Sequence, residues 1–295
     1  MFNQKLFIRF ITLGGMLISL VIAGCATKEV SWGDPQMGLF LRYNIRQGQT
    51  LNYTRKKETT QSMEMTHQSM KTIKNSVANY IIKGSGTDDK NNIKAQVIIN
   101  DLIINADSPQ GQINPDTSSL KGKGFGITFY PKGKEVESTG IDELPLISTG
   151  QPNGPGQSAK DFFLNLLPEL PPDNIKIGDT WGTPIDNKNK QGSLELTTRG
   201  ETTSVLDGLE TIQGMECIRI KSDSKSTVKG SGKIKGQDIK VDGNVNASST
   251  WYFAYEKGIF VKASLEEDAD MKINLGTMEE MPQTTKSKTT VELVH

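Results

Sequence analysis

Hydrophobic and polar positions alternate through residues 239–275 more regularly than elsewhere in the chain. Up to residue 253, six of the eight odd positions are apolar: Ile239, Val241, Val245, Ala247, Trp251 and Phe253. After residues 254–258, the odd positions again carry mostly apolar residues, and Phe260 falls on the polar face. A period of two buries one face of a strand and leaves the other in water. The segment therefore predicts a long β-hairpin with its turn at residues 254–258, each strand spanning about 50 Å.

The apolar face of this hairpin is too long for one short helix to cover. We therefore expect that two sheets cover each other, or that part of the face lines a groove for a ligand. The residues expected to face such a groove are apolar and share the odd positions: Val245, Trp251, Phe253, Leu265 and Met271.

Other stretches also favour strands, with turns between them. They are residues 51–65, 70–82 and 93–104 in the first half, and 194–206, 210–221 and 226–235 in the second. Residues 105–126 contain Pro and Gly in a polar setting, which predicts a loop. The expected fold is mainly β, with long antiparallel meander sheets in two related, curved half-barrel units.

Two pairs of short segments support the idea of related halves. Residues 44–51 and 174–181 share the pattern Asn-Ile-basic-x-Gly-x-Thr, and residues 129–136 resemble residues 253–261. Similar signals at similar offsets favour a duplicated β-unit, although matches this short also arise by chance. The expected boundaries are a first unit at 39–147, a linker at 148–172 and a second unit at 173–295.

The linker contains the only convincing helix in the sequence. Ser158 is placed to cap it, with Asp161 three residues later. Phe162, Phe163, Leu166 and Leu167 form one apolar face, and Pro168 is expected to end the helix at residue 167. A helix of about ten residues rises only about 15 Å.

Composition narrows the possible functions. The chain has 295 residues, with 34 Lys plus Arg against 34 Asp plus Glu. Nucleic-acid binding requires a concentrated basic patch, so this balance argues against a nucleic-acid partner. Lys221, Lys225, Lys229, Lys233 and Lys235 do share odd positions, and we interpret this stripe as a solvated strand edge rather than an anion site.

Residues that carry chemistry are scarce. The only histidines are His67 and His295, which leaves little scope for a catalytic triad. Cys217 lies in a strand-like pattern and is expected to be buried and unreactive. No set of side chains has the spacing of a metal site. We therefore expect no catalytic residues, no metal and no cofactor, and the protein is interpreted as a non-enzyme.

The N-terminal segment has the pattern of an export signal. Lys5 and Arg9 precede an apolar run at residues 10–23, a length typical of a secretory signal and too short for a membrane-spanning helix. The run ends in Ile22-Ala23-Gly24-Cys25, which resembles the lipobox of bacterial lipoproteins. The resemblance implies a signal peptide at residues 1–24 and a lipidated tether at 25–38. It also implies diacylglycerol on the Cys25 sulfur and a fatty acid, such as palmitate, on the Cys25 amine. A plain signal peptide is the alternative.

Residue 26 is Ala. An Asp there would resemble an inner-membrane retention signal, so in a bacterium with two membranes the resemblance favours the outer membrane. The Gly178-Asp-Thr-Trp181 turn resembles uncharacterised envelope lipoproteins, and the expected architecture is loosely similar to the half-barrels of lipoprotein carriers. We expect a lipid-anchored envelope protein whose concave β-surface binds an apolar ligand or an acyl chain. The alternative is a structural or assembly lipoprotein that docks an envelope protein partner through that face.

Overall fold

The computed structural model describes residues 33–65, 68–147, 158–163, 166–171, 173–191, 193–234, 237–276 and 280–294. The chain divides into two compact units, Met1–Ser31 and Trp32–His295, and all the described residues lie in the second. The expected lipobox with Cys25, as well as His67, Lys235 and His295, lies outside the described residues. None of the described helices is long and apolar enough to cross a membrane.

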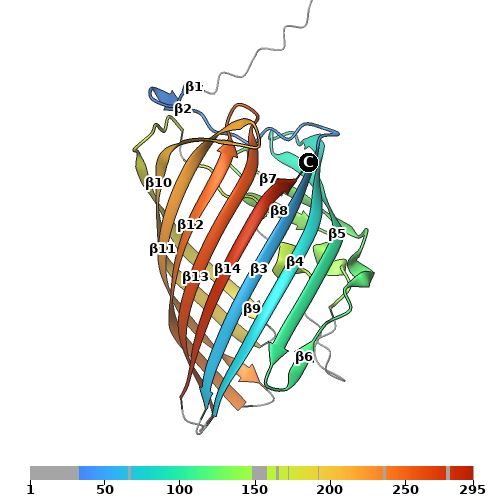
Figure 1. The fold of residues 1–295 in the computed structure, drawn as a ribbon, viewed down its shortest axis with the longest axis vertical. Helices are drawn as coiled ribbons and strands as arrows, with labels where there is room; N and C mark the ends of the chain where they lie inside the picture. The colour runs from blue at the N-terminus through green and yellow to red at the C-terminus, as the bar shows by residue number, and fades with distance from the viewer. Residues whose placement is uncertain are drawn as a thin grey trace, which may run out of the picture. The chain divides into compact units, whose positions relative to one another are not determined.

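The described residues form mainly antiparallel strands, as expected (Figure 1). Two short strands, β1 (Gly33–Asp34) and β2 (Gly38–Leu39), pair with each other. All other strands belong to one 12-stranded sheet. They are β3 (Thr50–Met65), β4 (Gln68–Thr87), β5 (Ile93–Ser108), β6 (Gly111–Ile113), β7 (Gly124–Phe129), β8 (Glu135–Thr139), β9 (Thr180–Gln191), β10 (Leu194–Ile212), β11 (Met215–Ile234), β12 (Gln237–Ala254), β13 (Ile259–Leu275) and β14 (Met281–Val294).

The long hairpin predicted from residues 239–275 is confirmed. Strands β12 and β13 have 18 and 17 residues and pair from Ala254 and Ile259 down to Ile239 and Leu275. The expected turn lies between them, with Gly258 in the left-handed region at φ 67° and its backbone close against Asn44. One expectation at this turn is wrong. A register shift after Tyr252 pairs Phe253 with Phe260, so the Phe260 side chain is buried rather than wet.

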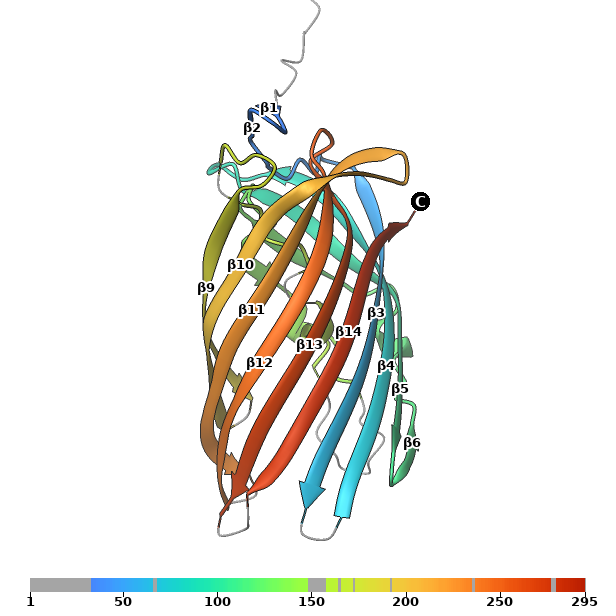
Figure 2. The same ribbon diagram turned by 60° about the vertical axis from the view of Figure 1, so that its left-hand side comes forward.

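Both halves of the sequence contribute to one sheet. Strand β14, near the end of the chain, pairs with β3 over twelve residue positions, from Gln283–Met63 to Val294–Asn52. The order within the sheet is β8-β7-β5-β4-β3-β14-β13-β12-β11-β10-β9, and β6 pairs only with β5. The sheet twists and curls, so it has a concave and a convex face (Figures 1 and 2).

The two segments that match in sequence adopt the same turn. Gly48 and Gly178 are both left-handed, at φ 80° and 94°. The side chain of the next residue, Gln49 or Asp179, accepts a hydrogen bond from the backbone three residues earlier, at 2.9 and 3.0 Å. Each turn leads directly into a strand, β3 or β9. Local sequence therefore specifies these two turns in the same way, and the duplication itself stays a prediction.

Several expected boundaries are wrong. Residues 210–221 and 226–235 were expected as two strands, but β11 runs unbroken from Met215 to Ile234, because Ser and Thr on its face pair across the sheet as well as apolar residues do. The expected loop at 105–126 contains the end of β5, all of β6, a 3-10 helix at Ser118–Leu120 and the start of β7. The helix is also shorter than expected: α1 spans Lys160–Phe163, and Leu166 and Leu167 are not helical.

Irregular segments, rather than a helix alone, cover one end of the concave face. Residues 39–45 cross it and contribute four buried side chains, Leu39, Leu41, Tyr43 and Ile45. The Tyr43 ring lies 5.2 Å from the Phe253 ring, and the Tyr43 hydroxyl donates to Pro168 O at 2.8 Å. Gly133, at φ 96°, brings the β7–β8 turn so close to Tyr43 and Pro168 that a Cβ would clash there. The apolar core therefore collects at the end of the sheet near the turn at residues 254–258.

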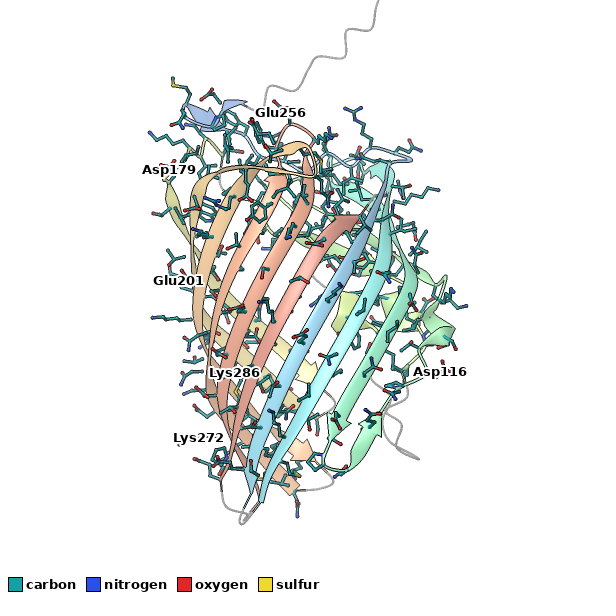
Figure 3. All side chains as sticks on the ribbon, in the orientation of Figure 1. Asp116, Asp179, Glu201, Glu256, Lys272 and Lys286 are labelled. Carbon is teal, nitrogen blue, oxygen red and sulfur yellow. The ribbon has the colours of Figure 1, made fainter. Side chains whose placement is uncertain are left out.

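The convex face is ionic along the same strands. Lys288 pairs with Glu266 at 3.0 Å and Lys262 with Glu292 at 2.6 Å, and both pairs join β13 to β14. Figure 3 shows Lys272, Lys286 and Glu201 among the side chains on the outside of the sheet. Exposed pairs of this kind contribute little to stability. Their alternation with the apolar positions of β13 is what the sequence pattern predicted.

Candidate binding site

A single row of side chains crosses the concave face at the edge of the core. The register places these eight residues side by side on adjacent strands: Leu206, Ile220, Trp251, Ala263, Val291, Arg55, Ala78 and Leu102. Neighbouring strands lie about 4.8 Å apart, so consecutive members of the row are in contact distance. Seven of the eight are apolar, and the exception is Arg55. The row therefore forms a continuous apolar band that contains one cation.

A cavity of about 250 Å³ lies over this row. Its floor comes from the sheet, and Leu166 and Pro168 line it from the segment after α1. The lining residues are Arg55, Tyr80, Leu166, Pro168, Ser249, Trp251, Phe260, Ala263, Leu265, Thr289 and Val291. Aliphatic and aromatic side chains dominate this list, with few polar groups. That composition is typical of a small-molecule site, although the volume falls below the roughly 300–1,000 Å³ of drug-sized ligands.

Among the described residues, Arg55 is the only charged side chain that lines this cavity. It is half-buried, and its Nη1 donates to the backbone oxygen of Phe162 at 2.9 Å, at the end of α1. No carboxylate among the described side chains forms an ion pair with it. Burial lowers the pKa of the guanidinium, and the nearby Tyr80 partly offsets this effect. An arginine nevertheless stays charged at neutral pH.

Tyr80 and Tyr53 differ in how their hydroxyls are satisfied. The rings stack at 5.6 Å, and both side chains are almost completely buried. The Tyr53 hydroxyl donates to Phe260 O at 2.7 Å. The Tyr80 hydroxyl has no hydrogen-bond partner among the described residues, and Tyr80 is one of the residues that line the cavity. Burial raises the pKa of Tyr80 and keeps it neutral.

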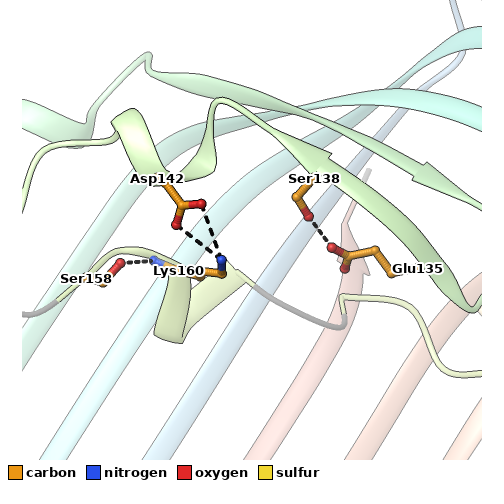
Figure 4. Close-up of polar contacts among 5 residues, drawn as sticks. All are labelled: Glu135, Ser138, Asp142, Ser158 and Lys160. Atoms are coloured by element: carbon orange, nitrogen blue, oxygen red, sulfur yellow. Dashed lines mark hydrogen bonds and ion pairs between the residues drawn. The ribbon is translucent and has the colours of Figure 1, made fainter. Parts of the chain in front are cut away.

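Contacts at both ends of α1 fix the position of the segment that leads to Leu166 and Pro168 at the cavity. The backbone N–H of Lys160 donates to Ser158 Oγ at 3.2 Å, so the Ser158 side chain satisfies a donor at the start of α1 (Figure 4). Ala159, rather than the expected Ser158, directly precedes the helix. The Lys160 Nζ lies 3.2 Å from Asp142, in the 3-10 helix Ile141–Glu143. The Phe163 ring meets the Tyr80 ring edge-on at 5.9 Å. These contacts attach the segment before Leu166 to the sheet.

The concave face becomes polar one row further from the core. The neighbouring row consists mainly of hydroxyl side chains, with one leucine, one isoleucine and one lysine: Ser204, Ser222, Ser249, Leu265, Thr289, Lys57, Ser76 and Ile104. The next row adds Glu267 and Lys74. Lys74 lies over the Phe162 ring, with its Nζ 5.3 Å from the ring centroid. A polar belt thus borders the cavity on the side away from the core.

The face turns apolar again beyond this belt. Val228, Val241, Met271, Ile273 and Met281 share it near the far ends of the strands, and most of them are only half-buried. Of these, only Val228 is largely buried, and it is separate from the main core cluster. The concave face therefore has a packed apolar end, a polar belt and a second apolar patch that is less completely buried than the first.

The five predicted groove residues fall in three places. Trp251 and Leu265 line the cavity. Phe253 is fully buried in the core beside it, against Tyr43. Val245 and Met271 lie on the same face beyond the polar belt, half-buried and outside the cavity lining. The structure thus brings two of the five together at the site, and a ligand-facing role for each stays a prediction.

Sequence reasoning missed Arg55 and Tyr80. A signal for Arg55 exists: it continues the odd positions of Leu51 and Tyr53, which are both buried, so an arginine follows an apolar series on one strand face. No comparable signal marks Tyr80, because its importance depends on the absence of a partner for its hydroxyl.

Cys217 and the lysines of β11, which stood out in the sequence, lie away from this cavity. Cys217 is buried and unpaired, and burial raises the pKa of its thiol to about 11, as an unreactive cysteine requires. The described lysines of the stripe, Lys221, Lys225, Lys229 and Lys233, lie on the exposed convex face of β11, a central strand rather than an edge. Lys221 lies 3.1 Å from Asp207. Among the described residues, no three potential metal ligands gather at one point.

A second cavity, of about 470 Å³, lies on the other side of the Leu166–Pro168 segment. Its lining combines Phe129, Lys134, Glu135 and Glu169 with Asn187 of strand β9. It is more polar than the first cavity and holds both acids and a lysine. The segment at Leu166 and Pro168 contributes to both cavities.

Comparisons with known proteins give no family assignment. No protein-family model matches the chain, and no curated protein matches it. Among solved structures, OccAB4 of Acinetobacter baumannii is 6% identical with a TM-score of 0.28, covering 84% of this chain and 99% of that one. The COG4313 outer membrane channel from Pseudomonas putida F1 is 9% identical with a TM-score of 0.28, covering 90% and 100%. The β domain of the Bordetella autotransporter BrkA has 6% identity and a TM-score of 0.25, covering 83% and 99%. Similarities at this level carry no functional assignment.

Proposed function

We propose that this protein is a non-enzymatic binding protein that holds an apolar ligand or an acyl chain on its concave β-surface. The observation that carries the proposal is the cavity over the Trp251–Ala263–Val291 row, whose walls are mostly aliphatic and aromatic. Removing apolar surface from water stabilises a bound chain by about 25 cal/mol per Å². Beyond the side chains of Arg55, Tyr80, Ser249 and Thr289, a site of this composition offers few groups to a polar substrate.

The proposal includes attachment to a bacterial cell envelope through lipidated Cys25, in the outer membrane where two membranes exist. Its support is the pattern Ile22-Ala23-Gly24-Cys25 after a short apolar run. Each buried CH₂ of an acyl chain adds about 0.8 kcal/mol to membrane affinity, so several chains on one cysteine anchor a protein stably. An anchored binding protein meets lipids at the membrane surface, which agrees with an apolar ligand.

Native mass spectrometry tests the binding proposal. A soluble form that starts at Ala26 is suitable, because every residue of the buried core lies between Leu39 and Leu293. We expect this form, purified without detergent, to carry a co-purified lipid or to bind the neutral apolar fluorophore N-phenylnaphthylamine. A protein that carries nothing and binds no such probe would contradict the proposal, and docking of a protein partner through this face would then be the reading to test.

A matched pair of substitutions locates the binding. Ala263→Leu adds bulk inside the cavity, whereas Ala247→Leu adds the same bulk two rows further along the same face, outside the cavity lining. We expect the first change to reduce probe binding at least about tenfold, a loss of about 1.4 kcal/mol, and the second to leave it unchanged. Thermal unfolding of both variants shows that the fold persists.

The anchor has its own test. Cys25→Ala removes the sulfur that the lipobox pattern assigns to diacylglycerol. Metabolic labelling with a radioactive fatty acid should mark the wild-type protein and not the variant, and the variant should leave the membrane fraction. Undiminished labelling of the variant would refute the lipobox interpretation and leave the binding proposal intact.

A further inference from the structure

Two polar groups converge on the cavity with hydrogen-bonding capacity to spare. Arg55 uses one N–H group on Phe162 O, which leaves the remaining donors of its guanidinium for another acceptor. Tyr80 has a buried hydroxyl with no partner among the described residues. The two side chains are diagonal neighbours, since Arg55 pairs with Ala78 and Tyr53 pairs with Tyr80.

Both groups would cost stability if nothing occupied the site. A buried polar group without a hydrogen bond is unfavourable, and a half-buried cation without an anion more so. Tyr53 shows that the fold can satisfy a buried hydroxyl at the adjacent position, because its own hydroxyl reaches Phe260 O. A phenylalanine at position 80 would fit the stack of rings equally well. The arrangement is therefore that of a binding site rather than of a core.

The charge around the cavity favours an anion. Arg55 is the only charged group in the lining that the described residues form. Lys57, the next inward-facing residue of β3, pairs with Thr289 at the edge of the cavity. Lys74 lies one row further along the same face. Among the described residues of these concave rows, the first acid is Glu267, on β13, with β14 between it and β3. A ligand at Arg55 therefore meets positive charge first.

We propose that the cavity binds a single-chain amphiphile with a carboxylate head, such as a fatty acid. Its carboxylate accepts hydrogen bonds from the Arg55 guanidinium and the Tyr80 hydroxyl, and its chain runs across Val291 and Ala263 toward Trp251 and Leu265. This inference rests on the proposed function, because it assigns the head group and direction of a ligand in the same cavity.

The dimensions of the cavity agree with a single chain. From Arg55 to Trp251 the row crosses three strand spacings, through β14 and β13 to β12, or about 14 Å. The small side chain of Ala263 lies midway along this path and leaves room above the sheet. A volume of about 250 Å³ accommodates a slender chain but not the two chains and large head of a membrane phospholipid.

A charge series of ligands with one chain length tests the head-group assignment. Dodecanoate, methyl dodecanoate and dodecylamine are compared, below their micelle concentrations, for displacement of N-phenylnaphthylamine from the form that starts at Ala26. We expect dodecanoate to bind at least about tenfold more tightly than the neutral ester, because charge-assisted hydrogen bonds to arginine are strong. The ammonium compound should bind most weakly of the three.

Three substitutions test which residues cause the preference for dodecanoate over its methyl ester. Arg55→Met keeps the length and apolar stem of the side chain and should remove the preference for dodecanoate, while the methyl ester still binds. Tyr80→Phe should reduce the preference by a few fold. Lys56→Met is the matched control: it removes a cation from the adjacent, exposed position of the same strand, and it should change nothing.

The outcomes separate the two proposals. If neither dodecanoate nor its ester displaces the fluorophore from the wild type, both proposals fail. If acid and ester bind equally, or if the preference survives Arg55→Met, the carboxylate inference fails and the apolar site stands. Should Arg55→Met not fold, Arg55→Lys provides the decisive variant: a point charge in place of the planar fork should retain only part of the preference.

Discussion

The two ends of the β12–β13 hairpin have the same sequence pattern but different surroundings. Near the turn, Trp251 and Phe253 are buried beneath residues 39–45 and the segment at Leu166–Pro168. Near the far end, Val245 and Met271 occupy equivalent inward positions and are only half-buried. Alternation thus specifies which face of a strand is apolar, and other parts of the chain decide how much of that face is removed from water.

The cavity lies where these two regions meet. On its core side, aromatic rings and aliphatic chains pack closely, and on the other side Ser, Thr and Lys side chains border it. A site at such a boundary can bury the chain of an amphiphile and leave its charged end near polar groups. This position explains why the single arginine of the apolar row is tolerated there.

The largest expected difference between the two ends concerns packing. Phe253→Ala removes a fully buried ring from contact with Tyr43 and should destabilise the protein by about 3–5 kcal/mol. Met271→Ala, at the far end of the same hairpin, should cost less than about 1 kcal/mol, because that side chain is already partly exposed to water. Urea unfolding of both variants measures the contrast, and equal losses would show that the far end is packed as tightly as the turn end.

A smaller difference in stability is expected between substitutions of the two stacked tyrosines. Tyr53→Phe leaves the buried oxygen of Phe260 without its donor and should cost about 1–3 kcal/mol. Tyr80→Phe removes a hydroxyl that has no partner among the described residues, so it should be neutral or slightly stabilising in ligand-free protein. Thermal unfolding of delipidated samples measures the difference between the two variants. A clear destabilisation by Tyr80→Phe would mean that its hydroxyl serves the fold rather than a ligand.

The smallest effect is expected beyond the polar belt. Val245→Thr should change the free energy of unfolding by no more than about 0.5 kcal/mol. Its neighbours on that face already include Ser226, and a hydroxyl there still reaches water. Chemical denaturation provides the measurement. A loss above about 2 kcal/mol would indicate that something covers this patch in solution.

Much of the architecture follows from local sequence. The turn at residues 254–258, the strands on either side of it and the ionic convex face all follow from alternation and from one glycine. The paired turns at Gly48 and Gly178 are equally local, because a glycine and a side-chain acceptor one residue later suffice to form them. Such features depend on residues within a few positions of each other.

The candidate site depends on contacts that no local pattern contains. Arg55, Val291 and Ala263 are neighbours only because the end of the chain pairs with β3 in one particular register. The burial of Phe260 depends on a register shift between β12 and β13, which exchanges the faces of the residues beside it. Neither the pairing partner of β3 nor that shift has a periodic signature.

The sequence by itself determined the strands, their apolar faces and the turns, because these follow from the chemistry of residues close together along the chain. Only the tertiary structure decided that Arg55 and Tyr80 meet Trp251 across one cavity, and which part of the apolar face is covered. The reason is physical: side chains on different strands become neighbours through long-range register, and register is settled by the packing of the whole sheet.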